Sequence, residues 1–281
     1  MFHLKFFCPR WGSESIPWDE FLSSVKKAGY AGIEWFPFGE KCNVEEVLDL
    51  LHHYELDFCI VMAILEPYNG YKNYMEALEK DLIQLMEIRN TKKAPLFISA
   101  QTGREFFTLD EIQGCLQLCD KIQEEYGTAI YQETHRNKWS YAAHVVGPVL
   151  EKNENVQLTF DVSHWFCVSE SYLEDQQAAV NETINHTRHI HARVGHTEGP
   201  QVWDPANEEY AEALQQHLLI WDKCVALAKQ ENRAYFSITP EFGPPPYMAK
   251  GNREISLVKE QWRLNLWMKD FLQHRYQAYL D

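Results

Sequence analysis

Basic residues are scarce in this sequence of 281 residues. Lys and Arg together number 26 against 41 Asp and Glu, which gives a formal net charge of −15 at pH 7. Such an acidic surface repels phosphate backbones and anionic lipid, and the sequence has no run of basic residues that would provide a local patch. We therefore expect a small-molecule partner and exclude nucleic acid and membrane surfaces.

Long hydrophobic runs are also lacking. No apolar stretch reaches the length of a membrane span, and the apolar opening segment is short enough to be a first strand rather than a targeting peptide. The seven cysteines are odd in number and scattered, which is typical of free thiols in a reducing compartment. These features predict a cytoplasmic protein.

No Pro-, Gly- or Ser-rich linker and no low-complexity tract divides the sequence. Short apolar runs alternate with longer amphipathic segments, which predicts eight strands, each followed by a helix. The predicted strands are 2–8, 31–36, 57–64, 95–101, 128–133, 156–161, 188–194 and 234–241, and the predicted helices are 18–28, 44–54, 72–91, 109–126, 138–151, 171–184, 206–230 and 252–277. This pattern indicates an α/β fold, a (β/α)8 TIM barrel, in a single domain over residues 1–281. An open doubly wound sheet would carry a glycine-rich turn after its first strand, and none follows here.

Polar residues gather at the ends of the last four predicted strands. TIM barrels place reactive groups at the C-terminal ends of strands, and alternate side chains of each strand point into the barrel. This phase turns Glu133, Asp161, His191 and Glu241 inward at one rim. His189 shares the phase of His191 one layer deeper, so it is an alternative ligand, a support for a ligand, or a filler of the interior. We assign the ligand role to His191, which lies nearer the rim.

Three carboxylates that point into one closed space repel one another unless a cation neutralises them. An oxygen-rich site with one imidazole suits Mn²⁺, Mg²⁺ or Co²⁺, with Zn²⁺ as an alternative. Each residue taken singly is also explained as a helix-capping acid or a solvated loop residue. Four in phase on neighbouring strands favour one divalent metal ion held by Glu133, Asp161, His191 and Glu241.

The same strand ends carry motifs that resemble a known superfamily. The motifs are QETH, FDVSH, HIHARVGHTEGPQVWDP and TPEFG, all within residues 130–245. They are similar to the xylose isomerase-like TIM-barrel superfamily, which includes sugar isomerases and epimerases, inosose dehydratases and AP endonucleases of family 2. In its tagatose/psicose epimerase branch, a Glu, an Asp, a His and a Glu at these strand ends hold one divalent ion. The resemblance implies the same ligands here, makes Glu133 and Glu241 the acid/base pair, and places His164 against the substrate.

The sequence departs from that branch after His191. The epimerases continue this strand with Gly-Glu and then an Arg, whereas this chain has Arg193-Val194-Gly195-His196. The resemblance therefore does not name the substrate. The early strand ends also lack the additional His and Asp ligands of endonuclease IV, which argues against a nuclease.

Together, the residues and the resemblance imply an isomerase or epimerase of a sugar or related hydroxy-carbonyl compound. A divalent ion would polarise the substrate carbonyl and stabilise an enediolate, while Glu133 or Glu241 removes the α-proton and the other returns one. The expected substrate-binding residues are His164, Arg193, His135 and Glu34. A lyase that expels water from the same enediolate and a non-catalytic sugar-binding barrel are the alternatives.

Aromatic and proline-rich segments also fall at strand ends. Trp11, Trp165 and Trp203 lie in loops where aromatic faces suit sugar rings, although core packing explains them equally well. The loop from Gly243 to Tyr247, stiffened by its prolines, is expected to wall one side of the pocket. The final helix is either a solvated face or the contact of a homo-oligomer.

Overall fold

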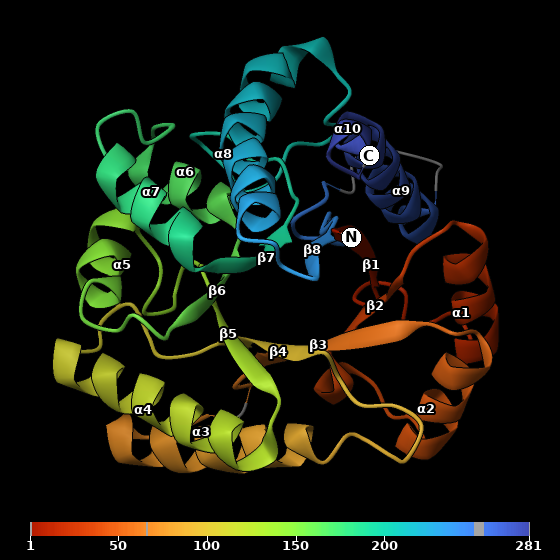
Figure 1. Cartoon of the computed structure of the whole chain (residues 1–281), viewed down its shortest axis with the longest axis horizontal. Helices are drawn as coiled ribbons and strands as arrows, with labels where there is room; N and C mark the ends of the chain where they lie inside the picture. Colours follow the sequence, from red (N-terminus) through yellow and green to blue (C-terminus); the bar gives the residue numbers. More distant parts are fainter. Residues whose placement is uncertain (1, 66, 250–255, 281) are drawn as a thin grey trace.

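Eight parallel strands close into a barrel in this computed structural model, which describes residues 2–65, 67–249 and 256–280 (Figure 1). Each strand pairs with its sequence neighbours, and β1 closes the ring against β8. The strands are β1 (His3–Pro9), β2 (Gly32–Trp35), β3 (Asp57–Ala63), β4 (Phe97–Gln101), β5 (Ala129–Glu133), β6 (Gln157–Phe160), β7 (Thr187–His191) and β8 (Tyr235–Thr239). The predicted (β/α)8 TIM barrel is confirmed.

Helices surround the barrel and connect successive strands (Figure 1). They are α1 (Trp18–Lys27), α2 (Val44–His53), α3 (Gly70–Met86), α4 (Leu109–Tyr126), α5 (Ala143–Leu150), α6 (Val162–Ser169), α7 (Gln177–His186), α8 (Ala211–Gln230), α9 (Leu257–Arg275) and α10 (Gln277–Leu280), with 3₁₀ turns η1 (Pro37–Gly39) and η2 (Glu208–Tyr210). Outward-facing strand residues such as Ile33, Phe58 and Leu158 pack with them into one large hydrophobic core. No helix in the described ranges combines the length and apolarity that a bilayer crossing needs.

The limits of α4 follow from its sequence. The side chain of Thr108 accepts a hydrogen bond from the backbone N–H of Glu111, and the Glu111 carboxylate accepts one from the N–H of Thr108 at 2.8 Å. This reciprocal cap satisfies two donors that a helix start otherwise leaves free. Gly127 ends the helix with a φ of +71°, a left-handed conformation that glycine adopts without a Cβ clash.

Several helix limits differ from the prediction. α3 ends at Met86 rather than 91, and the Asn90 side chain then accepts hydrogen bonds from the N–H groups of Lys92 and Lys93, each at 2.9 Å, which stabilises a turn. α8 begins at 211 rather than 206, after the separate turn η2. The predicted start of the final helix, at residue 252, lies outside the described residues.

The largest differences follow β5 and β6. α5 begins at 143 rather than 138, because the preceding loop buries Trp139 and Ser140. The short helix α6 was not predicted: it starts directly after Asp161, whose side chain accepts the N–H of Ser163 at 2.9 Å and so caps it. The next helix, α7, consequently begins at 177 rather than 171.

Inside the barrel, the side chains change from apolar to charged along the strands. Phe7, Cys59, Phe97 and Tyr131 form a separate apolar cluster, in which the Phe97 and Tyr131 rings stack 4.5 Å apart. Two residues further along β4, the buried Ser99 hydroxyl donates to Thr159 Oγ1 at 2.9 Å. We call these four apolar residues the apolar plug. The charged groups lie above it, at the C-terminal rim of the barrel.

Candidate active site

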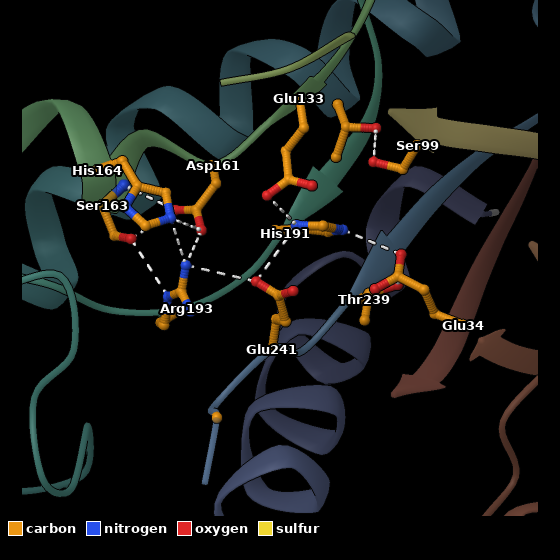
Figure 2. A network of polar contacts seen from close by, with 12 residues as sticks. Glu34, Ser99, Glu133, Asp161, Ser163, His164, His191, Arg193, Thr239 and Glu241 are labelled. Carbon is orange, nitrogen blue, oxygen red and sulfur yellow. Dashed lines mark hydrogen bonds and ion pairs between the residues drawn. The ribbon is translucent and has the colours of Figure 1, made fainter. Parts of the chain in front are cut away.

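The C-terminal ends of the strands bring charged side chains together at one rim of the barrel (Figure 2). Glu133 is the last residue of β5 and His191 the last of β7, while Asp161 directly follows β6 and Glu241 lies two residues beyond β8. All four side chains are buried. The structure therefore places the four predicted ligands in one region, with the inward orientation that strand alternation predicts.

His191 lies between three carboxylates (Figure 2). Its Nε2 is 3.0 Å from Oε2 of Glu34, and its Nδ1 is 3.3 Å from Oε2 of Glu241 and 3.6 Å from Oε1 of Glu133. Both His191 Nδ1 and Glu241 Oε2 are buried without a hydrogen bond. When Nε2–H donates to Glu34, the neutral ring keeps its lone pair on Nδ1, directed at Glu133 and Glu241.

These residues fit a divalent ion. One ligand atom each from Glu133, His191 and Glu241 lie within 4.8 Å of one another. An ion at this point would satisfy the two buried atoms that lack a hydrogen bond. Glu34 behind the imidazole fixes the ring, as carboxylates commonly do for metal-binding histidines.

His189 lies one layer deeper, and both of its ring nitrogens have hydrogen-bond partners. Nδ1 is 2.7 Å from the Ser237 hydroxyl, and Nε2 is 3.1 Å from the Thr239 hydroxyl. His191 instead has a free Nδ1 that faces the carboxylates at the rim. His189 Nε2 also lies 3.3 Å from Oε2 of Glu34, so this histidine supports Glu34 from the layer below, and His191 is the better candidate ligand.

Asp161 is held by donors of the chain itself. Its Oδ1 accepts hydrogen bonds from the backbone N–H of Ser163 at 2.9 Å and from the Ser163 hydroxyl at 2.5 Å. Its Oδ2 is in close contact with Nη2 of Arg193. The same nitrogen is 3.4 Å from Oε2 of Glu241, so the guanidinium lies between two of the predicted ligands (Figure 2).

Two further imidazoles lie beside this guanidinium. The rings of His135 and His164 have centroids 4.0 Å apart, and His164 Nε2 is 2.8 Å from Nη2 of Arg193. Burial and the nearby charge of Arg193 together lower the pKa of both rings, and they bring that of His135 to about 3. Both imidazoles are therefore neutral near pH 7, a form that both donates and accepts hydrogen bonds.

The carboxylates attract positive charge to His191. Burial alone would lower the pKa of His191, but Glu241, Glu34 and Glu133 raise it well above its usual range. Burial would likewise raise the pKa of Glu34, but His191 and His189 hold it well below its usual range. Burial does raise the pKa of Glu133, against the effect of His191. The site thus favours a cation at Nδ1 of His191, whether a proton or a metal ion.

A cavity of about 280 Å³ opens onto these groups. The predicted site residues that line it are Glu34, Glu133, His135, Arg193 and Glu241. Its apolar lining is formed by Pro9, Trp11, Phe36, Val61, Ala63, Leu65 and Tyr247. A polar cluster that faces apolar and aromatic walls suits a small molecule with both C–H surfaces and hydroxyl groups.

Sequence reasoning missed Gln101, and it did not decide which tryptophans line the pocket and which pack in the core. Gln101 ends β4, lines the cavity, and places its amide nitrogen 3.1 Å from each carboxylate oxygen of Glu133. Its position at a strand end was the available signal. Trp11 and the proline-rich loop, through Tyr247, line the cavity. Trp165 is instead buried, where its indole donates to the Ser140 carbonyl at 2.8 Å.

Scans of the sequence against protein-family models and against curated proteins give no match. Solved structures, however, resemble the chain over almost its full length. A xylose isomerase domain-containing protein from Salmonella typhimurium is 15% identical with a TM-score of 0.64, covering 96% of this chain and 97% of that chain. A D-allulose 3-epimerase from Methylomonas sp. is 14% identical with a TM-score of 0.62, covering 97% and 98%. A probable 3-DHS dehydratase from Bacillus anthracis is 15% identical with a TM-score of 0.58, covering 92% and 98%.

At these identities the likeness concerns the path of the backbone. It spans the barrel and agrees with the strand-end motifs that predicted it. The chain therefore shares the TIM-barrel fold of these proteins.

Proposed function

We propose that this chain is a metal-dependent isomerase or epimerase of a sugar or a related hydroxy-carbonyl compound. The observation that carries the proposal is the pair of buried atoms without hydrogen bonds, His191 Nδ1 and Glu241 Oε2, which lie 3.3 Å apart beside Glu133 at the cavity. The fold supports the proposal, because sugar epimerases share it. Cytoplasmic location and a homo-oligomer stay predictions.

One divalent ion, Mn²⁺, Mg²⁺ or Co²⁺, with Zn²⁺ as the alternative, is the proposed cofactor. Glu133, His191 and Glu241 supply ligand atoms that already lie close together, and Asp161 is the fourth member of the predicted set. When bound, the ion would polarise the substrate carbonyl and stabilise negative charge on its oxygen.

Glu133 and Glu241 are the proposed acid/base pair. They lie on two sides of His191 and both line the cavity (Figure 2). One carboxylate takes the proton from the carbon next to the carbonyl, and the electron pair of that C–H bond remains in an enediolate. The other returns a proton to the opposite face of the same carbon, which inverts it. Alternatively, it returns the proton to the former carbonyl carbon while the neighbouring hydroxyl proton passes to the former carbonyl oxygen, which moves the carbonyl. The raised pKa of buried Glu133 favours its holding a proton between the two steps.

The remaining polar groups bind and orient the substrate. Neutral His135 lines the cavity and matches a hydroxyl group, which also donates and accepts, and Arg193 donates to carbonyl or carboxylate oxygens. His164 does not line the cavity and contacts Arg136 and Arg193 through its two ring nitrogens, so its proposed role is to hold Arg193 in place. Gln101 fixes the Glu133 carboxylate through its amide. The rings of Trp11 and Tyr247, whose centroids are 5.5 Å apart, offer apolar faces to the C–H surface of a sugar.

The test is solvent exchange in D₂O with Mn²⁺-loaded protein and a panel of ketohexoses, followed by proton NMR. We expect deuterium at the carbon next to the carbonyl without loss of water; loss of water would identify the lyase instead. Glu133→Gln and Glu241→Gln should each lower the exchange rate by roughly 10²–10⁴-fold, the usual contribution of a positioned acid or base. Glu87→Gln, an exposed glutamate far from the rim, is the matched control. Equal rates in all three variants would overturn the proposal.

A further inference from the structure

We propose that Arg193 withholds Asp161 from the metal ion, so that the ion has three protein ligands and the guanidinium is a second, permanent cation of the site. The inference rests on the proposed metal-dependent function. It arises where the sequence departs from the epimerase motif, because the residue that faces Asp161 at this point of the chain is an arginine.

Both carboxylate oxygens of Asp161 already have partners within the chain. Oδ1 accepts two hydrogen bonds from Ser163 and caps α6, and Oδ2 is paired with Arg193. An ion at Asp161 would therefore have to compete with the two Ser163 donors for Oδ1 or with the guanidinium for Oδ2. His191 Nδ1 and Glu241 Oε2, in contrast, are buried without a hydrogen bond and face each other, so an ion can bind them without breaking a hydrogen bond.

Arg193 is too firmly held to give way. Its side chain is 1% exposed, its Nη2 lies 2.8 Å from His164 Nε2, and its guanidinium carbon lies 4.6 Å from the centre of the Tyr247 ring. Moving the buried guanidinium away from Asp161 would give up its closest carboxylate and its contacts with His164 and Tyr247, which is costly. The pair is therefore expected to persist when the ion binds.

The guanidinium also acts on the ion directly. Its Nη2 is 3.4 Å from Oε2 of Glu241, one of the three ligands, so a fixed positive charge lies next to the metal position. That charge repels a divalent ion and shares the negative charge of its ligand. Because arginine stays protonated at all relevant pH values, the effect is permanent. The site should hold its ion more weakly than four free ligands would.

The experiment measures Mn²⁺ affinity, by electron paramagnetic resonance of free Mn²⁺, in metal-free protein and five variants. Arg193→Met should tighten binding by roughly tenfold or more, a typical effect of residues next to metal ligands. Asp161→Asn alone should weaken binding far less than Glu133→Gln does. In the Arg193→Met background the same Asp161→Asn substitution should weaken binding clearly, because Asp161 is then free to act as a ligand. Arg188→Met is the matched control, because Arg188 lies on the same strand at the opposite end of the barrel and should leave the affinity unchanged.

The outcomes separate the two proposals. Wild-type protein that binds Mn²⁺, with no tighter binding in Arg193→Met, would overturn the inference and leave the metal-dependent function standing. Absence of binding in every protein would overturn both. If Arg193→Met does not fold, the comparison of Asp161→Asn with Glu133→Gln still decides, since equal losses of affinity would make Asp161 a ligand like Glu133.

Discussion

Replacing Glu34 by Gln tests whether the Glu34 carboxylate holds the His191 ring in place, without removing any proposed metal ligand. Oε2 of Glu34 lies 3.0 Å from His191 Nε2 and 3.2 Å from the Thr239 hydroxyl, and the carboxylate is buried. A hydrogen bond to a charged group contributes about 1.5–3 kcal/mol, and a neutral one about 1 kcal/mol. Since the carboxamide keeps the shape and one acceptor but loses the charge, the metal-free variant should lose about 1–2 kcal/mol of unfolding free energy.

The effect of Glu34→Gln on metal binding should be larger. Groups that fix a metal-binding histidine typically contribute 10–100-fold in affinity, so Mn²⁺ binding should weaken by about that factor. Urea denaturation with and without Mn²⁺, together with direct titration, measures both quantities. Glu46→Gln, on the exposed side of α2, is the control. A variant that unfolds at the same urea concentration and binds Mn²⁺ as tightly as wild type would refute the reasoning.

Two other predictions concern the segment after β7. Burial lowers the pKa of His217 to about 4, whereas the same side chain in the unfolded chain takes up its proton near pH 6.5. The contribution of neutral His217 to the free energy of unfolding is therefore complete above pH 6.5. It is lost as pH falls toward 4, by up to roughly 3 kcal/mol. Urea denaturation between pH 4 and 7 should therefore show a shallower decline in His217→Gln, and an unchanged slope would count against it. Gly195→Ala places a Cβ 2.8 Å from the Pro200 carbonyl, which should cost at least about 1 kcal/mol and lower the melting temperature; an equal melting temperature would show that the loop yields.

The positions of the candidate ligands were predictable because they depend on two rules of regular geometry. Alternation along each strand decides which side chains enter the barrel, and parallel strands in a closed ring end at the same rim. These rules place Glu133 and His191 at the site and His189 one layer below, as the structure shows. Small errors in strand limits did no harm, because a shift of the strand end does not change the phase.

The pairing among the charges was not predictable in the same way. Phase alone turns Arg193 inward, but it does not decide which carboxylate the guanidinium contacts. That choice depends on α6, whose first turn places Ser163 against Asp161 and fixes the carboxylate beside Arg193. Because α6 was not predicted, neither was this pair. Gln101 was not predicted as a site residue for another reason. Its side chain is an uncharged amide, and its role becomes visible from its distance to Glu133 on the neighbouring strand.

The apolar plug beneath the site explains why the buried charged side chains above it lie close to groups of opposite charge. Phe7, Phe97 and Tyr131 fill the barrel below His189, so electrostatic interactions above them act at a low effective dielectric, where an unpaired charge is costly. Glu34 and Asp161 each meet this requirement with a close partner of the chain itself, His191 and Arg193 respectively. Glu133 and Glu241 only share these cations, at 3.3 to 3.6 Å, and both line the cavity. Of the three carboxylates that line the cavity, Glu34 has a close cation of its own, whereas Glu133 and Glu241 do not, and this difference supports their proposal as the acid/base pair.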